Sequence, residues 1–246
     1  VFLLLFLSIT NFIFSQQNLN SQFTVVVDAG HGGKDPGNTG NGYLEKKIAL
    51  SIALKLGKKL EDNGVKVVYT RKSDVFVNLF ERANIANSSN AQLFISIHCD
   101  SHTSQAYGAG TFVLGLHANQ RNFEVAKKEN SVIFFEEDYI NKYEGFDPNN
   151  PESVIGLTLM QEEYLDQSIV AASYIQNSFV NRLKRRNRTV KQAGFIVLKY
   201  TYMPSVLVET GFLTNNSEGA YLNSGRGQNE MADAIASAVI DYKNDF

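Results

Sequence analysis

Cysteine is nearly absent from this chain, which has Cys99 and no other thiol among its 246 residues. A disulfide within the chain is therefore excluded, and stability has to come from a buried core. An excess of either charge is also absent, because 23 lysines and arginines stand against 25 aspartates and glutamates. The dense basic surface that nucleic-acid binding usually needs is missing, so we expect no nucleic-acid partner.

The one locally basic stretch is a run of four cationic side chains, Lys184, Arg185, Arg186 and Arg188. A solvated helix end is the simpler interpretation of such a run, and a binding site for a polyanion is the alternative. The sequence alone favours the solvated helix end.

Long apolar runs are absent except at the start, where residues 1–14 are almost continuously apolar and Ser15 precedes polar residues. This pattern is typical of a secretory signal peptide with a small residue before the cleavage site. A membrane-spanning helix needs about 20 apolar residues, so this run is short for one. We expect residues 1–15 to be a signal peptide truncated at its start, and the rest to be secreted to the periplasm or cell wall. A core strand or a membrane anchor is the alternative.

From residue 22 onward, short apolar runs alternate with helical periods, which is typical of an α/β domain. Ile48, Ile52, Leu56 and Leu60 recur every four residues, and Asn63-Gly64 is a natural helix stop. The sequence predicts a single monomeric domain over residues 22–246, with a mostly parallel sheet and helices on both faces. The expected strands are 24–28, 65–70, 93–98, 110–114, 195–200 and 205–209, and the expected helices are 44–63, 79–87, 119–138, 153–184 and 228–242.

Three of the expected strands end in groups that can bind a metal or transfer a proton. Asp28 and His31 follow the first strand, His98 ends the third, and Glu209 ends the last. The carboxyl ends of parallel strands meet at one edge of a sheet, where such folds bind their ligands. We therefore expect these groups to converge in one cleft.

The residue types in this cleft favour a catalytic zinc site. Zinc in such a site takes three protein ligands and leaves a fourth position for water. His31 and His98 supply two, and Glu45 fits as the third because it opens the helix that follows the glycine-rich loop. Glu209 then remains as the general base that takes a proton from the water and passes it to the leaving amine.

Four motifs in order resemble the zinc-dependent N-acetylmuramoyl-L-alanine amidases of the AmiC type. They are Val-Asp-Ala-Gly-His-Gly-Gly at residues 27–33, the glutamate after the loop, Ser-Ile-His-Cys-Asp-Ser at 96–101 and Val-Glu-Thr-Gly-Phe-Leu-Thr-Asn at 208–215. The resemblance implies one zinc ion bound by His31, Glu45 and His98, with Glu209 as the catalytic glutamate. It also implies hydrolysis of the amide between N-acetylmuramic acid and L-alanine in bacterial peptidoglycan.

An insertion at about residues 119–151 is longer than a simple crossover needs. In division-linked members of the family that the chain resembles, a comparable insertion carries a helix that blocks the zinc until a protein partner displaces it. The expected plug lies at residues 134–138, with Glu136, Glu137 or Asp138 covering the metal. An exposed acidic helix end is the alternative.

Other polar residues of the motifs have weaker interpretations. His102 is a candidate for substrate contact, whereas His117 is read as a surface residue. Cys99 should face away from the metal because adjacent strand residues point to opposite faces. Asp28 and Asp100 are candidates for orienting the ligands or contacting substrate, and Arg71 and Arg82 for pairing with carboxylates under the cleft.

Several enzyme classes are excluded by pattern, and two alternatives stay open. The chain has no phosphate-binding Walker loop or dinucleotide fingerprint, since Asp35 stands where each motif needs another residue, and no Gly-x-Ser-x-Gly or His-Glu-x-x-His. A zinc peptidase or amidase acting on another cell-wall amide is one alternative. A non-catalytic peptidoglycan-binding or activator protein is the other.

Overall fold

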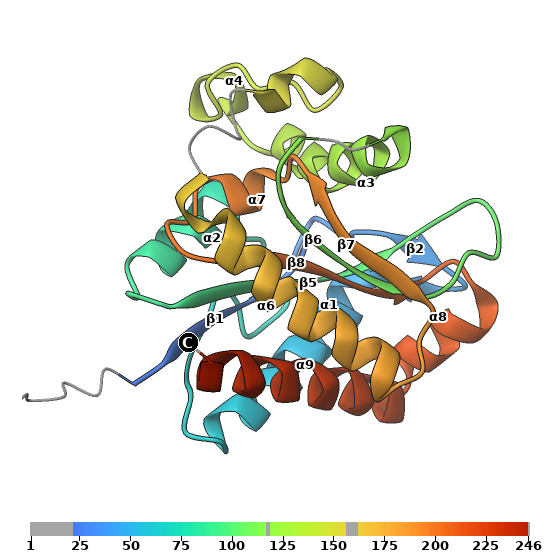
Figure 1. Cartoon of the computed structure of the whole chain (residues 1–246). Helices are drawn as coiled ribbons and strands as arrows, with labels where there is room; N and C mark the ends of the chain where they lie inside the picture. The colour runs from blue at the N-terminus through green and yellow to red at the C-terminus, as the bar shows by residue number, and fades with distance from the viewer. Residues whose placement is uncertain (1–21, 117–118, 156–161, 246) are drawn as a thin grey trace, which may run out of the picture.

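The computed structural model describes residues 22–116, 119–155 and 162–245. The expected signal peptide and His117 lie outside these residues. A six-stranded sheet in the order β4-β1-β5-β8-β6-β7 runs through the centre (Figure 1). Its strands are β1 (Thr24–Ala29), β4 (Lys66–Tyr69), β5 (Leu93–Asp100), β6 (Ala109–Leu114), β7 (Asn187–Ala193) and β8 (Ser205–Phe212).

The sheet is mostly parallel, as the sequence predicted. β4, β1, β5 and β8 run in one direction, whereas β6 pairs antiparallel with β8 and carries β7 parallel to itself. β1, β5 and β8 are therefore adjacent parallel strands whose carboxyl ends lie at the same edge. A two-stranded hairpin of β2 (Thr39–Gly40) and β3 (Tyr43–Leu44) lies in the loop after β1.

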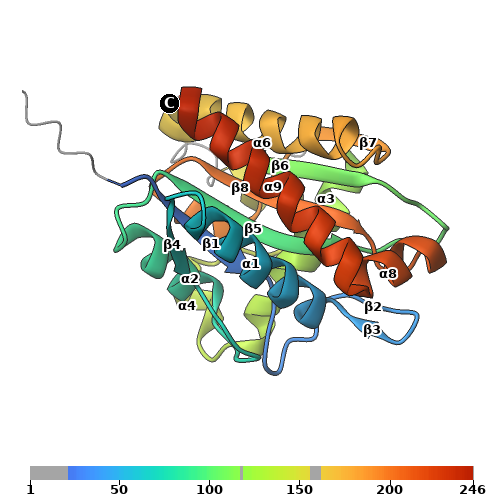
Figure 2. The same ribbon diagram turned by 90° about the horizontal axis from the view of Figure 1, so that it is seen from below.

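Helices cover both faces of the sheet, which confirms the predicted architecture. Figure 2 shows α1 (Glu45–Glu61), α9 (Gly225–Asp245) and α6 (Glu162–Asn181) side by side across one face. The other face carries α2 (Leu79–Asn87), α3 (Gln120–Asn130) and α7 (Ile196–Lys199). The remaining short elements are η1 (Ser131–Phe135), α4 (Tyr139–Lys142), η2 (Pro151–Val154) and α8 (Asn216–Asn223). Within the described residues, none of the helices has the length and apolar character of a transmembrane span.

The alternation of strand side chains separates two apolar cores and selects the face of the active groups. Val25, Val27 and Ile95 pack in the core beneath α1, α6 and α9, whereas Val26 and Phe94 pack in the core beneath α2, α3 and α7. Side chains two residues apart share a face. Asp28, Ser96, His98 and Glu209 therefore follow the second set onto the face of α2 and α3.

Two predictions of secondary structure were wrong or incomplete. Residues 195–200 were expected to be a strand, but Ile196–Lys199 form α7, because a short apolar run buried on all sides looks the same in a strand and a helix. The edge strand β7 was missed because it is mostly polar and only its last residue, Ala193, is fully buried. The expected helix 119–138 ends as α3 at Asn130 and continues as η1.

Candidate metal centre

The glycine-rich loop brings His31 against the ends of β1 and β5. Its glycines are required by close contacts, since a Cβ on Gly30 would lie 2.5 Å from the His98 ring and one on Gly37 would lie 2.6 Å from the His31 ring. Gly37 also has a φ of +66°, which favours glycine. The loop therefore packs its backbone directly on two imidazoles.

Four side chains converge at this position: His31, Glu45, His98 and Glu129. Glu45 Oε1 lies 3.2 Å from His31 Nε2 and from His98 Nδ1, and Glu129 Oε2 lies 3.0 Å from the same two nitrogens. One ligand atom from each side chain lies within 4.8 Å of every other. The donor atoms of a tetrahedral zinc site are about 3.3 Å apart, given bonds of about 2.0–2.2 Å. The observed spacing fits such a site.

The hydrogen bonding of these donor atoms also supports a metal site. His31 Nε2, His98 Nδ1 and Glu129 Oε2 are buried and form no hydrogen bond with any described residue, although they lie close to one another. Buried polar atoms are rarely left without a partner. Ligand atoms that lie close together without hydrogen bonds to one another are what a bound cation requires.

The outer nitrogen of each imidazole is fixed by a hydrogen bond. His31 Nδ1 lies 2.7 Å from Asp35 Oδ2, and His98 Nε2 lies 3.1 Å from Ser96 Oγ, which in turn donates to Asp28 Oδ2 at 2.5 Å. Such partners set the tautomer and the ring orientation of metal-binding histidines. Asp28 thus acts on His98 through Ser96, as an orienting group of the kind the sequence suggested.

Charge inside the cluster is balanced between two imidazoles and two carboxylates. Burial by itself lowers the pKa of both histidines, but Glu45 and Glu129 outweigh it and raise the pKa of His98 to about 9. Burial likewise opposes ionisation of Glu45, yet His31 and His98 hold its pKa well below the usual range. A bound cation would replace the imidazole protons, so its affinity should rise with pH.

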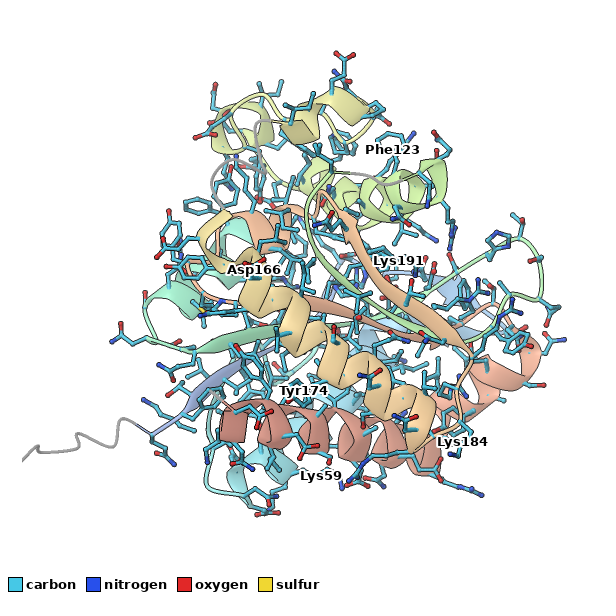
Figure 3. The ribbon with its side chains drawn as sticks, in the orientation of Figure 1. Lys59, Phe123, Asp166, Tyr174, Lys184 and Lys191 are labelled. Carbon is cyan, nitrogen blue, oxygen red and sulfur yellow. The ribbon has the colours of Figure 1, made fainter. Side chains whose placement is uncertain are left out.

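Glu209 lies beside the cluster, because His98 of β5 and Glu209 of β8 are direct strand partners. Both of its carboxylate oxygens are buried, and neither has a hydrogen-bond partner in the part of the chain that the structure describes. Burial, followed by the charges of Asp100 and Glu129, raises the pKa of Glu209 well above its usual value. Lys191 on β7 opposes this shift from the far side of β6 (Figure 3). Burying an unpaired carboxylate costs free energy. Such groups are concentrated at functional sites, and general base catalysis is a role that fits Glu209.

Glu129 was missed from the sequence, and the predicted plug at residues 134–138 was wrong. Glu136 accepts a hydrogen bond from the Tyr143 hydroxyl at 2.7 Å and pairs with Lys142 at 3.1 Å, away from the cluster. The insertion does reach the site, but through the end of α3. Asn130 fixes that end, since its side chain donates to Gly194 O at 2.7 Å and accepts from Ile196 N at 2.9 Å.

The arginines under the cluster hold the backbone of the loop. Arg82 pairs with Asp28 at 2.6 Å, as expected, and also donates to the carbonyl of His31 at 2.7 Å. Arg71 instead donates to the carbonyls of Ala29 and Gly30, at 2.9 and 2.8 Å. The expectation of a carboxylate partner for Arg71 is therefore replaced by backbone contacts.

The Asp28–Arg82 pair gives a stability prediction. Burial opposes ionisation of Asp28, but Arg82 and two hydroxyls hold its pKa below the usual value. Arg82→Met leaves that carboxylate buried and unpaired, so unfolding in urea should become easier by about 3–5 kcal/mol at pH 7. The native pair stabilises the fold above the unfolded pKa of about 3.9 and loses this effect as pH falls, so the deficit should shrink below about pH 4.

A matched control for this prediction is Arg226→Met, which removes an exposed arginine that pairs with Glu230 on the same helix. It should unfold at the urea concentration of the wild type. An Arg82→Met protein as stable as the wild type at pH 7 would show that the pair is not needed.

The other singled-out residues lie at the margin of the site. Cys99 packs in the core beneath α1, away from the cluster, as predicted, and its backbone N–H donates to Glu45 Oε1 at 2.7 Å. Asp100 pairs with Arg121 at 2.7 Å. His102 lines two surface grooves, and its role in substrate contact stays a prediction.

Comparison with known proteins adds an independent line of evidence. The family model described as N-acetylmuramoyl-L-alanine amidase matches residues 25–241. The N-acetylmuramoyl-L-alanine amidase AmiA of Escherichia coli (strain K12) is 34% identical over 223 residues, which cover 89% of this chain and 75% of that protein.

Solved structures agree with the sequence comparison. N-acetylmuramoyl-L-alanine amidase AmiC2 of Nostoc punctiforme superposes with a TM-score of 0.68 at 30% identity, covering 90% of this chain and 97% of the other. The CwlD amidase of Clostridioides difficile, solved in complex with the GerS lipoprotein, gives a TM-score of 0.67 at 26% identity over 92% of this chain and 100% of the other.

Proposed function

Because the chain belongs to the N-acetylmuramoyl-L-alanine amidase family and is thus an amidase of peptidoglycan, we propose that its hydrolysis depends on one zinc ion. His31, Glu45 and His98 are the proposed protein ligands, and Glu209 is the proposed general base. The observation that carries the proposal is the convergence of Glu45 with the buried ring nitrogens of His31 and His98, which have no hydrogen-bond partner among the described residues, beside the likewise unpartnered Glu209. The bond cleaved is the amide between N-acetylmuramic acid and L-alanine.

A zinc ion held by His31, Glu45 and His98 would supply a Lewis acid for the scissile carbonyl and for the attacking water, whose pKa it would lower to near ~7. Glu209 takes a proton from the attacking water and later passes it to the leaving amine, so no covalent intermediate is needed. Asp35 and Ser96 hold the outer nitrogens of the two imidazoles, which would leave the inner nitrogens free to bind the ion. Burial of Glu209 keeps bulk water away from the carboxylate, which strengthens its interaction with the proton it carries.

Glu129 is the proposed inhibitory group. Its carboxylate lies at 3.0 Å from both histidines and completes a fourth ligand position, where substrate and water have to enter. The arrangement in this structure is therefore a closed state in which α3 must move before catalysis. A protein activator that displaces α3 is the proposed partner, and the similarity to an amidase solved with a lipoprotein partner is consistent with that.

Peptidoglycan lies outside the cytoplasmic membrane, so the substrate places the proposed site of action in the periplasm or cell wall. The apolar stretch at residues 1–14 supports secretion through a signal peptide. We propose that the mature enzyme works as a monomer, since all four residues of the centre come from one chain.

Metal removal tests the zinc requirement. Dialysis against a chelator should reduce hydrolysis of purified sacculi to background, and stoichiometric zinc should restore it, whereas magnesium should not because it prefers six oxygen ligands. Elemental analysis of the active protein should give about one zinc per chain. Activity in a protein without stoichiometric metal would contradict the proposed zinc requirement.

Two other functions are separated by further measurements. An enzyme acting on a different cell-wall amide would release different fragments, so mass spectrometry of digested muropeptides identifies the bond cut. A non-catalytic binding or activator protein would bind sacculi without releasing peptides. The intact set of His31, Glu45, His98 and Glu209 favours turnover.

A further inference from the structure

A surface groove of about 510 Å³ opens beside the catalytic edge, where β8 ends. Six of the residues that line it are His102, Tyr107, Arg121, Arg186, Arg188 and Phe212. Its walls come from the loop after β5, from the first turn of α3, from the segment around the start of β7 and from the end of β8. No carboxylate lines this groove among the described residues.

Among the described residues, two of the three arginines in the groove are not paired with a carboxylate. Arg121 is neutralised by Asp100, with one guanidinium nitrogen 2.7 and 2.8 Å from the two carboxylate oxygens. Within the described part of the chain, no carboxylate lies within ion-pair distance of Arg186 or Arg188. The groove therefore carries about two uncompensated positive charges.

Aromatic rings hold these two guanidinium groups in place. Arg186 lies over the Tyr107 ring at 5.1 Å, and Arg188 lies over the Phe212 ring at 4.9 Å. Arg188 Nε also donates to the carbonyl of Tyr107 at 2.9 Å, which leaves its terminal nitrogens for another partner. A guanidinium held by stacking loses little entropy when it binds, and its fork matches a carboxylate.

The position of the groove relative to Glu209 suggests which carboxylate it takes. Phe212 is three residues beyond Glu209 on β8, but a bulge pairs it with Asp100, two residues beyond the Glu209 partner His98, so the two lie about 7 Å apart along the sheet. Two or three residues of an extended peptide span about 7–10 Å. The lactyl carboxyl of N-acetylmuramic acid is the acyl group of the scissile amide, so it carries no free charge. Free carboxylates therefore occur on the peptide side of that bond.

We propose that Arg186 and Arg188 bind a free carboxylate of the stem peptide, on the amine side of the scissile bond. This inference rests on the proposed amidase function and deepens it, because it makes the groove a specificity site for acidic peptides. It also replaces the interpretation of the basic run as a solvated helix end for these two residues.

Paired substrates test the proposal through kinetics. Two synthetic muramoyl peptides are compared that differ only in whether the peptide carboxylate near the cleavage site is free or amidated. The wild type should cleave the free acid with a kcat/KM about 10-fold higher. The double variant Arg186→Ala/Arg188→Ala should lose this preference through a higher KM, with kcat unchanged. Arg188→Lys should keep part of it because charge remains without the fork.

Arg182→Ala is the matched control, since this exposed arginine at the end of α6 lines no part of the groove. It should keep the full preference of the wild type. Equal cleavage of the two substrates by the wild type overturns the proposal.

A binding measurement separates this inference from the proposed function. Fluorescence anisotropy follows a labelled stem peptide, as free acid or carboxamide, titrated with chelator-treated full chain. Binding of the acid about 10-fold tighter than the amide, lost in the double variant, supports the groove even if no hydrolysis is ever seen. Equal binding of both peptides overturns it. Stronger binding of a glycerol-phosphate polymer, competing with the acid peptide, also overturns it in favour of a phosphate site.

Discussion

Glu209→Gln is expected to lower the hydrolysis of purified sacculi by about 10²–10⁴-fold. The amide keeps the size of the side chain but cannot accept the proton of the attacking water. Zinc content should stay at that of the wild type, because Glu209 is not among the four converging ligand residues. Release of soluble peptides measures the rate, and elemental analysis measures the metal.

Glu61→Gln, at the exposed end of α1, is the control for loss of a carboxylate. It should retain the rate of the wild type. A Glu209→Gln enzyme that keeps full activity would mean that another group acts as the base. Loss of zinc together with activity would instead assign Glu209 a part in building the metal centre.

Glu129→Ala is expected to act in the opposite direction and raise the rate by about 10- to 100-fold. If the closed arrangement outweighs the open one by about 100 to 1, only about one molecule in a hundred is competent at any time. Removing the Glu129 carboxylate frees the position that it takes at 3.0 Å from both histidines. The rate on sacculi, measured without any partner protein, reports the change.

Glu124→Ala gives the matched control, because Glu124 lies on the same helix but is exposed and contacts Gln120. Its rate should equal that of the wild type. An unchanged rate in Glu129→Ala would contradict the inhibitory role. A Glu129→Ala protein that no longer retains zinc would show that Glu129 serves as a permanent ligand.

The sequence predicted the elements that carry strong local signals. The four-residue period of Ile48, Ile52 and Leu56 gave α1, and the buried valine run gave β1, because each pattern reflects a face that must be covered. The elements with weak local signals were not predicted. β7 is an edge strand with few apolar residues, and α7 is an apolar run too short to show a period.

The residues of the site likewise fall into those that the sequence predicted and one that it did not. His31, His98 and Glu209 stand in motifs at the ends of adjacent parallel strands, so strand topology was enough to bring them to one edge. Glu45 was predicted from its place at the start of the helix after the glycine-rich loop. Glu129 lies on a helix with several acidic and basic side chains, and no sequence motif surrounds it. Nothing in its neighbourhood of sequence distinguishes it from Glu124.

The sequence by itself determined the chemistry of this protein, because residue types at the ends of adjacent parallel strands fix which groups can meet. Only the tertiary structure decided access to that chemistry. Asn130 anchors α3 to residues more than sixty positions away, and this contact turns Glu129 into the cluster. Such long-range docking depends on the shape of packed surfaces, which no local period or motif encodes.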